Sequence, residues 1–288
     1  ESFTGSSVSV SKEQLMKVSK TNVLKALQAF DPSFRIQTNN QWGSDPNALP
    51  EMYIRGRSGV GVKQLDPNYT SKGNLQNNPN LPTFIMDGFE ISVQKLYDMD
   101  PSRIANITIL KDAAATALYG SRGANGVIVI TSAKPVPGKV SVKYRGTLRL
   151  ELVDLNTYDR LNAREKFDLE EKLQVWDLYK ETDVYKALKE SVEKGNDYDW
   201  LSIPTRNGVG QNHVFNIMGG DEVWKFSANL SYDEKIGVMK GSERNNFNGS
   251  LHVSYTSKRF VVDEVLSVGV NTSSDSPYGS FSDYANMN

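Results

Sequence analysis

Long runs in which apolar and polar side chains alternate restrict the fold of this chain most. Between Val140 and Val153 one face carries Val142, Tyr144, Gly146, Leu148, Leu150 and Leu152, and the residues between them are polar or charged. A period of two over this length predicts a β-strand with one apolar face and one polar face. Further strands are predicted at Trp224–Tyr232 and Phe247–Tyr255, more weakly at Leu266–Thr272, and without clean alternation at His213–Met218.

These runs are compatible with two architectures. Each has about the 9–11 residues that a tilted membrane-spanning strand needs, and aromatic residues lie near the ends. A soluble β-sandwich would show the same alternation, so the pattern alone leaves both open. The polar face is rich in small serine and asparagine residues, which favours a barrel with a wet interior.

Composition excludes several other classes of protein. With 38% hydrophobic residues and a mean hydropathy of -0.48, the chain has no run of 18 apolar residues and hence no transmembrane helix. A formal net charge of -1 argues against a nucleic-acid-binding surface. There is no cysteine, and the two histidines, His213 and His252, lack an acidic partner at motif spacing. We therefore expect no enzyme activity, no metal site and no cofactor.

The stretch Asp100–Thr131 organises the first half of the chain. A brief apolar strand at Ile107–Leu110 precedes an alanine-rich helix at Asp112–Leu118, and a buried strand follows at Val127–Ile130. Asp112 suits the N-terminal end of this helix, where a carboxylate caps the chain and complements the dipole. These elements predict a compact β-α-β unit.

Three glycines, Gly120, Gly123 and Gly126, separate that helix from the strand after it. A dinucleotide-binding loop has its glycines between a strand and the start of a helix, so that phosphate meets the helix N-terminus. Here the order is reversed, which argues against a phosphate loop. We predict instead that the glycines cap the helix and turn the chain.

Shorter signals lie earlier in the chain. Ser6–Val10 is a strand candidate, Ser11–Gln14 fits a capping box, and Asn22–Phe30 predicts an amphipathic helix. Thr83–Met86 and Phe89–Ile91, joined by an Asp-Gly pair, predict a β-hairpin.

Three of these segments resemble one family. LKDAAATALYGSRGANGVIVITS, at residues 110–132, is similar to the segment that closes the plug domain of TonB-dependent outer-membrane transporters of the SusC/RagA family. EMYIRGRSGV, at Glu51–Val60, resembles the family's "IRG" strand, and LPTFIMDGF, at Leu81–Phe89, resembles its hairpin. The segments stand in the family's order and at its spacing.

The resemblance implies a fold in two parts. Residues 1–135 would form an α+β plug domain, and residues 136–288 the first antiparallel strands of a transmembrane β-barrel of about 22 strands when complete. Because only about five strands are predicted, we expect an incomplete barrel. The Ton box that the energising partner grips would lie upstream of Glu1, and residues of about 157–198 would form a helical extracellular loop.

The plug motifs that the resemblance implies supply candidate gating residues. They are Arg55, Gly56, Asp87, Gly88, Lys111, Asp112, Tyr119, Gly120, Arg122, Gly123 and Gly126. A plug inside a polar lumen needs contacts that can be exchanged for water, so we expect Arg55 and Arg122 to form salt bridges with the barrel wall. Ordinary exposed charge is the alternative for these two arginines, and a plain turn residue is the alternative for Asp87.

Candidate substrate contacts come from two loops. The asparagine-rich stretch Gly61–Leu81 contains Asn74 and Asn77. The loop after the first long strand predicts helices at Ala163–Lys180 and Val184–Val192. Trp176 and Trp200 lie in or beside it and could stack on sugar rings, although packing of the loop core explains them as well.

Two functions remain open from the sequence. The resemblance implies import of oligosaccharides or oligopeptides across the outer membrane of a Gram-negative bacterium of the Bacteroidetes type. A SusD-like surface lipoprotein, the TonB-ExbB-ExbD energising complex and outer-membrane lipid would then be partners, and nucleic acid would not. The alternative is a soluble glycan-binding protein made of a plug-like α+β domain and a β-sandwich.

Overall fold

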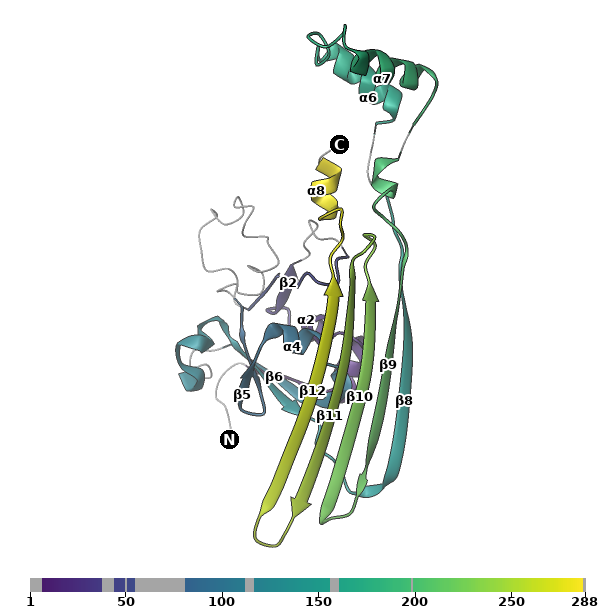
Figure 1. Cartoon of the computed structure of the whole chain (residues 1–288). Helices are drawn as coiled ribbons and strands as arrows, with labels where there is room; N and C mark the ends of the chain where they lie inside the picture. The colour runs from purple at the N-terminus through teal and green to yellow at the C-terminus, as the bar shows by residue number, and fades with distance from the viewer. Residues whose placement is uncertain are drawn as a thin grey trace.

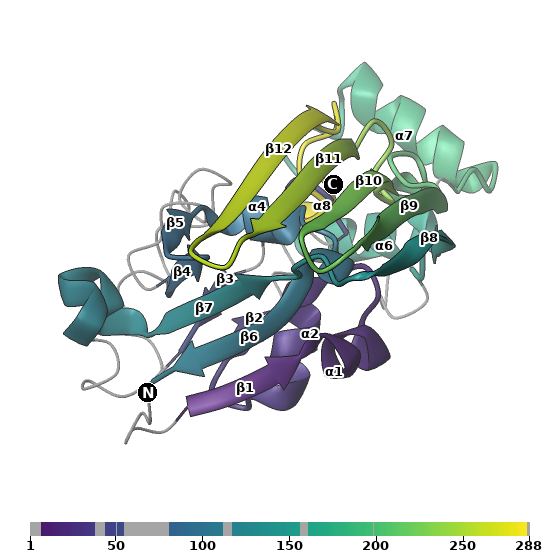
Figure 2. The ribbon, with the colours of Figure 1, turned by 90° about the horizontal axis from the view of Figure 1, so that it is seen from below.

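The computed structural model describes residues 7–37, 44–49, 51–54, 81–111, 117–155, 161–197 and 199–286. Two five-stranded sheets and one two-stranded sheet account for the described strands. The first five-stranded sheet and its helices form an N-terminal unit, residues 7–132. This unit lies against one face of the second sheet, which is a tall curved wall made of β8 to β12 (Figures 1 and 2).

The N-terminal unit alternates short strands and helices. In chain order these are β1 (Ser7–Ser11), α1 (Lys12–Val18), α2 (Val23–Phe30), β2 (Arg35–Gln37), β3 (Glu51–Tyr53), β4 (Thr83–Met86), β5 (Phe89–Ile91), α4 (Val93–Tyr97), η3 (Pro101–Arg103), β6 (Ile104–Leu110), η4 (Ala117–Asn125) and β7 (Val127–Ser132). The sheet order is β1-β6-β7-β4-β5, in which only β4 and β7 run parallel.

Apolar side chains cover both faces of this sheet. On one face, strand residues such as Ile107 and Ile128 pack with Leu15, Leu24 and Leu96 from the helices into one buried cluster. The other face is covered by η4, whose Tyr119 packs near Leu110 and Val127. Burial on two faces explains why β7 begins with the continuous apolar run Val127–Ile130.

The early signals are confirmed by local geometry. The Ser11 side chain accepts from the Gln14 backbone, the Gln14 side chain accepts from the Ser11 backbone, and α1 follows. Asp87 (φ 50°) and Gly88 (φ 89°) form the hairpin turn between β4 and β5, since two successive left-handed residues match the twist of the strands.

The segment between β6 and β7 differs from the predicted helix followed by a glycine turn. Of the helix expected at Asp112–Leu118, only Ala117 and Leu118 lie among the described residues, and they begin the 3-10 segment η4. The glycines therefore lie within or directly after a helical segment, which is kinked at Gly120 (φ 63°). Gly126 (φ 94°) directly precedes β7.

The wall consists of five antiparallel strands in sequence order. They are β8 (Gly138–Glu151), β9 (Gly208–Gly220), β10 (Trp224–Ile236), β11 (Glu243–Thr256) and β12 (Val261–Ser274). The strands β9 to β12 are longer than the runs predicted for them, whereas β8 has the predicted length and begins and ends two residues earlier. Alternation is hidden in β9 because polar Gln211 and His213 share a face with Val209 and Phe215, and apolar Val214 is buried on the opposite face.

The two faces of the wall differ in chemistry. Predicted apolar residues of β8 point away from the N-terminal unit, and Val142, Leu148 and Leu150 are 65%, 67% and 61% exposed. The opposite face is polar and faces that unit. Its residues Asn229, Asn246 and His252, for example, are all buried. Apolar residues facing outward and polar residues facing inward are the arrangement of a membrane barrel rather than of a sandwich.

The segment between β8 and β9 carries two helices far from the N-terminal unit (Figure 1). They are α6 (Ala163–Lys172) and α7 (Asp183–Glu193). The prediction that one helix reaches Lys180 is wrong, because the chain leaves helical geometry at Gln174 (φ 60°) and continues as turns. The remaining short elements are η5 (Trp200–Ser202) and α8 (Phe281–Asn286). No described helix is long and apolar enough to cross a membrane.

Candidate functional site: the interface between the N-terminal unit and the wall

The segment from α4 to η3 presents two carboxylates to the wall. Asp98 follows the last residue of α4. Asp100 caps η3, where its side chain accepts from the Ser102 backbone at 2.9 Å, and Pro101 takes the first helical position. Two helical segments that meet at Asp98-Met-Asp100 thus hold both acids in fixed positions.

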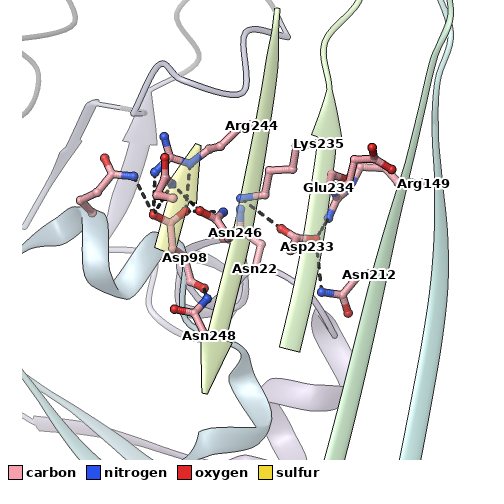
Figure 3. A network of polar contacts seen from close by, with 12 residues as sticks. Asn22, Asp98, Arg149, Asn212, Asp233, Glu234, Lys235, Arg244, Asn246 and Asn248 are labelled. Carbon is pink, nitrogen blue, oxygen red and sulfur yellow. Dashed lines mark hydrogen bonds and ion pairs between the residues drawn. The ribbon is translucent and has the colours of Figure 1, made fainter. Parts of the chain in front are cut away.

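Asp98 is bound by side chains from two wall strands (Figure 3). Arg244 on β11 donates through Nε to Oδ1 at 3.0 Å and through Nη2 to Oδ2 at 2.6 Å. Asn246 donates to Oδ1 at 2.9 Å, and Asn271 on β12 donates to Oδ2 at 3.5 Å. Asn248 donates to the Asp98 carbonyl oxygen at 3.4 Å. A forked guanidinium with added amides is a strong carboxylate-binding geometry.

Asp100 makes a corresponding contact with another strand of the wall. Its carboxylate pairs with the guanidinium of Arg145 on β8, and the Asp100 side chain is 3% exposed. Nearby, Ser102 accepts a hydrogen bond from Asn216 on β9 at 3.3 Å. The segment from Asp98 to Ser102 therefore contacts the wall at β8, β9, β11 and β12.

A third group of contacts surrounds Asp233 on β10 (Figure 3). Arg149 from β8 and Lys235 lie 3.4 and 3.5 Å from its carboxylate oxygens, and Asn212 donates to it at 3.2 Å. The Lys235 ammonium also lies 4.0 Å from the centre of the Tyr97 ring at the end of α4, a cation–π contact. Wall cations thus contact Tyr97, Asp98 and Asp100 within four consecutive residues.

Further polar contacts join the two parts away from this segment. Asn47 donates to the Ser274 carbonyl oxygen at 2.8 Å, and the Ser44 hydroxyl accepts from the Val238 backbone at 2.9 Å. Arg103 donates to Ser267 at 3.0 Å. None of these groups buries an apolar core, so water can replace the partners when the two parts separate.

The predicted gating residues occupy other places. Asp87 and Gly88 form the hairpin turn, where the Asp87 carboxylate accepts from the Ser132 backbone at 3.0 Å. Lys111 pairs with Asp31 within the N-terminal unit at 2.8 Å, and not with the wall. Tyr119, Gly120, Gly123 and Gly126 belong to η4 or follow it directly. Arg55, Gly56, Asp112, Asn74, Asn77 and the side chain of Arg122 lie outside the described residues.

The Asp31–Lys111 pair is an internal brace of the unit. Burial of Asp31 works to raise its pKa, but the hydrogen bonds from Lys111 and Ser33 outweigh this and hold the pKa below the ordinary value. The charged form of Asp31 is therefore favoured by the folded unit.

The sequence did not identify the main contact residues, namely Asp98, Asp100, Arg145, Arg149, Arg244 and Asn246. Two signals were present: the polar face of the first long strand contains Arg145 and Arg149, and two aspartates flank Met99 just before Pro101. Neither signal says which wall residue meets which carboxylate, because the pairing depends on how the unit sits against the wall.

The two tryptophans are not brought together. Trp176 packs with Phe167 and Tyr185 in the small core between α6 and α7, and its indole donates to Glu170 at 2.9 Å. Trp200 is 53% exposed in η5. Packing of the loop core thus accounts for Trp176, whereas the role of Trp200 stays a prediction.

No cluster of metal-ligating side chains occurs in the described ranges. The two histidines lie on β9 and β11. His213 is hydrogen-bonded with Tyr144 at 2.7 Å, and His252 lies 3.6 Å from Asp263 on β12, an acidic neighbour that sequence spacing did not indicate.

The chain is similar in sequence to TonB-dependent receptors. The family model described as TonB-dependent Receptor Plug Domain matches residues 1–127. The TonB-dependent receptor SusC of Bacteroides thetaiotaomicron is 27% identical over 260 residues, covering 88% of this chain and 23% of the relative. The TonB-dependent receptor P3 of Formosa agariphila is 29% identical over 262 residues, covering 90% and 22%. The chain therefore spans about a quarter of the length of these relatives.

Solved structures share the fold. The RagAB peptide importer in its closed-closed state superposes with a TM-score of 0.73 at 22% identity, covering 95% of this chain and 31% of that chain. The ferric yersiniabactin uptake receptor FyuA from Yersinia pestis gives a TM-score of 0.54 at 13% identity, covering 93% and 32%. The predicted fold class, a plug followed by the first barrel strands, is confirmed.

Proposed function

We propose, on the premise that this chain belongs to the TonB-dependent receptors and is the N-terminal part of an outer-membrane transporter of the SusC/RagA type, that its N-terminal unit gates nutrient import. In these terms the N-terminal unit is the plug and the wall is the first part of the barrel. The family consists of receptors and not of enzymes.

The observation that carries this proposal is the polar interface. The plug is held to the inner face of the wall through ion pairs and amide hydrogen bonds, above all Asp98–Arg244 and Asp100–Arg145. Such contacts lose little net free energy when water replaces them together, whereas a shared apolar core would resist separation. A plug that must close the lumen and then move suits this kind of interface.

We propose oligosaccharides or oligopeptides as the substrates. Support comes from the relative named SusC and from the solved structures described as peptide importers. Partners on this reading are a SusD-like lipoprotein outside and the TonB-ExbB-ExbD complex, which would pull on a segment preceding the plug. The division of the chain into residues 1–135 and 136–288 belongs to the same proposal.

A soluble glycan-binding protein is not favoured by the described strands. In a sandwich, the apolar face of β8 to β12 would pack on a second sheet, but it is exposed along β8 and β12. Aromatic rings of Trp224, Tyr255 and Phe260 also gather at the ends of β10, β11 and β12, as expected for a membrane interface.

Complementation tests the proposal. A strain that lacks the full-length receptor is given the wild-type gene or a variant, and uptake of labelled oligosaccharides and peptides of six units is measured. We expect receptor-dependent uptake of at least one of these classes. Normal outer-membrane insertion without uptake of either class would contradict the import function.

A further inference from the structure

Arg244, Asn246 and Asn271 together form a binding site for a carboxylate on the wall itself. The guanidinium fork and both amides come from β11 and β12, and they converge on the two oxygens of Asp98. Side-chain exposure is only 7% for Arg244 and 12% for Asp98. The wall thus holds a nearly complete site for a carboxylate, and a residue of the plug occupies it (Figure 3).

The same relation recurs two residues further along this plug segment, at β8. Arg145 binds the carboxylate of Asp100, which is 3% exposed. Between these two sites Lys235 contacts the Tyr97 ring, and Lys235 is the direct strand partner of Arg244. Movement of the segment Tyr97–Asp100 therefore uncovers three wall cations and removes two of the carboxylates that they face.

A cation that the departing plug segment uncovers has lost the anion that it paired with, which is unfavourable. Water relieves part of this cost, and another carboxylate relieves more because it fits the same guanidinium fork. The vacated wall consequently favours a solute that carries carboxylates over a neutral solute of equal size.

We propose that Arg244 with Asn246, and separately Arg145, are subsites for the carboxylates of an acidic oligomer, and that Asp98 and Asp100 occupy these subsites while the plug is closed. This inference rests on the proposed import function and specifies its substrate class. The shared chemistry is a row of carboxylates along a linear oligomer, as in a uronic-acid oligosaccharide or a glutamate-rich peptide. By competing with Asp98, such a substrate would also promote release of the plug.

The test compares acidic and neutral probes in cells that make the full-length receptor. Hexagalacturonate is paired with maltohexaose, and hexaglutamate with hexaglutamine, each labelled and supplied below saturation. Uptake is corrected with the strain that lacks the receptor. The two pairs separate a sugar carboxylate from a peptide carboxylate.

Two variants separate the subsite from the anchor that closes the plug. Asp98→Asn removes the anchor and keeps Arg244 in the wall, whereas Asp98→Asn with Arg244→Gln removes both. Lys189→Gln on the exposed face of α7 is the control for loss of one positive charge. Surface expression of each variant is measured, so that uptake is given per receptor.

Uptake of one acidic probe should exceed that of its neutral counterpart by about tenfold or more, and raised salt should weaken this preference. Adding Arg244→Gln to Asp98→Asn should lower the ratio of acidic to neutral uptake about tenfold, whereas Lys189→Gln should leave this ratio unchanged. Equal uptake of acidic and neutral probes, or equal loss of both, would overturn the subsite while leaving import intact. Failure to import any of the four probes would instead overturn the proposed function, and this inference with it.

Discussion

Replacing Asp98 by asparagine should loosen the plug where it meets the wall. The carboxylate accepts from Arg244 and Asn246, so every group that faces it is a donor. An amide at this position would turn two N–H donors toward those donors and leave the Arg244 guanidinium, 7% exposed, without its anion. Removing one partner of a buried ion pair costs about 3–5 kcal/mol. We expect a cost at the lower end of this range, because water can enter a polar interface.

About 3 kcal/mol corresponds to a change on the order of a hundredfold in a local opening equilibrium. Amide hydrogen exchange of the full-length receptor in detergent measures this opening directly, in peptides that cover residues 93–103. We expect exchange there to become about a hundred times faster in Asp98→Asn, and exchange within β9 and β10 to change little.

Two comparisons make this result specific. The double variant Asp98→Asn with Arg244→Gln should exchange more slowly than the single variant, because no unpaired guanidinium remains buried. Asp87→Asn alters an aspartate of the same plug at the hairpin turn, away from the wall, and should leave residues 93–103 unchanged. Less than a threefold change in Asp98→Asn, or no recovery in the double variant, would refute the reasoning.

Three further predictions concern the plug and the loop. Gly126→Ala should lower the free energy of plug unfolding by about 1–3 kcal/mol, since φ is 94° and a Cβ atom would lie 3.1 Å from Ile54. The urea midpoint for unfolding should fall accordingly, and an unchanged midpoint would contradict this. Because the pKa of Asp31 is lowered, its stabilising effect is present above the ordinary carboxyl pKa and is lost as pH falls through the folded value. The melting temperature of Asp31→Asn should therefore depend less on pH below about pH 4 than that of wild type, as thermal melts at several pH values would show. Trp176→Ala should speed exchange throughout α6 and α7 while Trp200→Ala should not, and the reverse pattern would argue against a packing role for Trp176.

Local features of the plug could be predicted because the residues that define them are close in sequence. The capping box at Ser11, the hairpin turn at Asp87-Gly88 and the strand at Val127 each depend on neighbours within a few positions. The alternating pattern of β8 likewise predicted which face of the wall would be exposed.

Features set by long-range contacts could not be predicted. The length of β9 could not be predicted because Gln211 and His213 place polar side chains on the face that Val209 and Phe215 share. Gly210 allows the close approach of β10, since a Cβ atom there would lie 2.4 Å from the Glu234 carbonyl oxygen. The helix expected to reach Lys180 ends early because the backbone turns at Gln174 (φ 60°), and Trp176 beyond this turn donates to Glu170. Neither cause is visible in hydrophobic periodicity.

The interface residues illustrate the same limit. Arg145 was visible as a charged residue on the polar face of a strand, and Asp98 as an acid in a turn. Arg244 lies 146 positions from Asp98, so their contact is a product of the complete fold. The expectation that Arg55 and Arg122 pair with the wall stays a prediction, because Arg55 and the side chain of Arg122 lie outside the described residues. The arginines that pair with Asp98 and Asp100, namely Arg244 and Arg145, come from the wall.

The most direct test of the account is to lock the plug to the wall. Ser102 and Asn216 are joined by a hydrogen bond of 3.3 Å across the interface, and the 288 residues contain no cysteine, so Ser102→Cys with Asn216→Cys introduces one defined pair into this region. If the plug gates import, oxidation of this variant in the full-length receptor should abolish uptake and a reductant should restore it, while each single variant stays active. Uptake that continues at the wild-type rate with the disulfide fully formed would contradict the account.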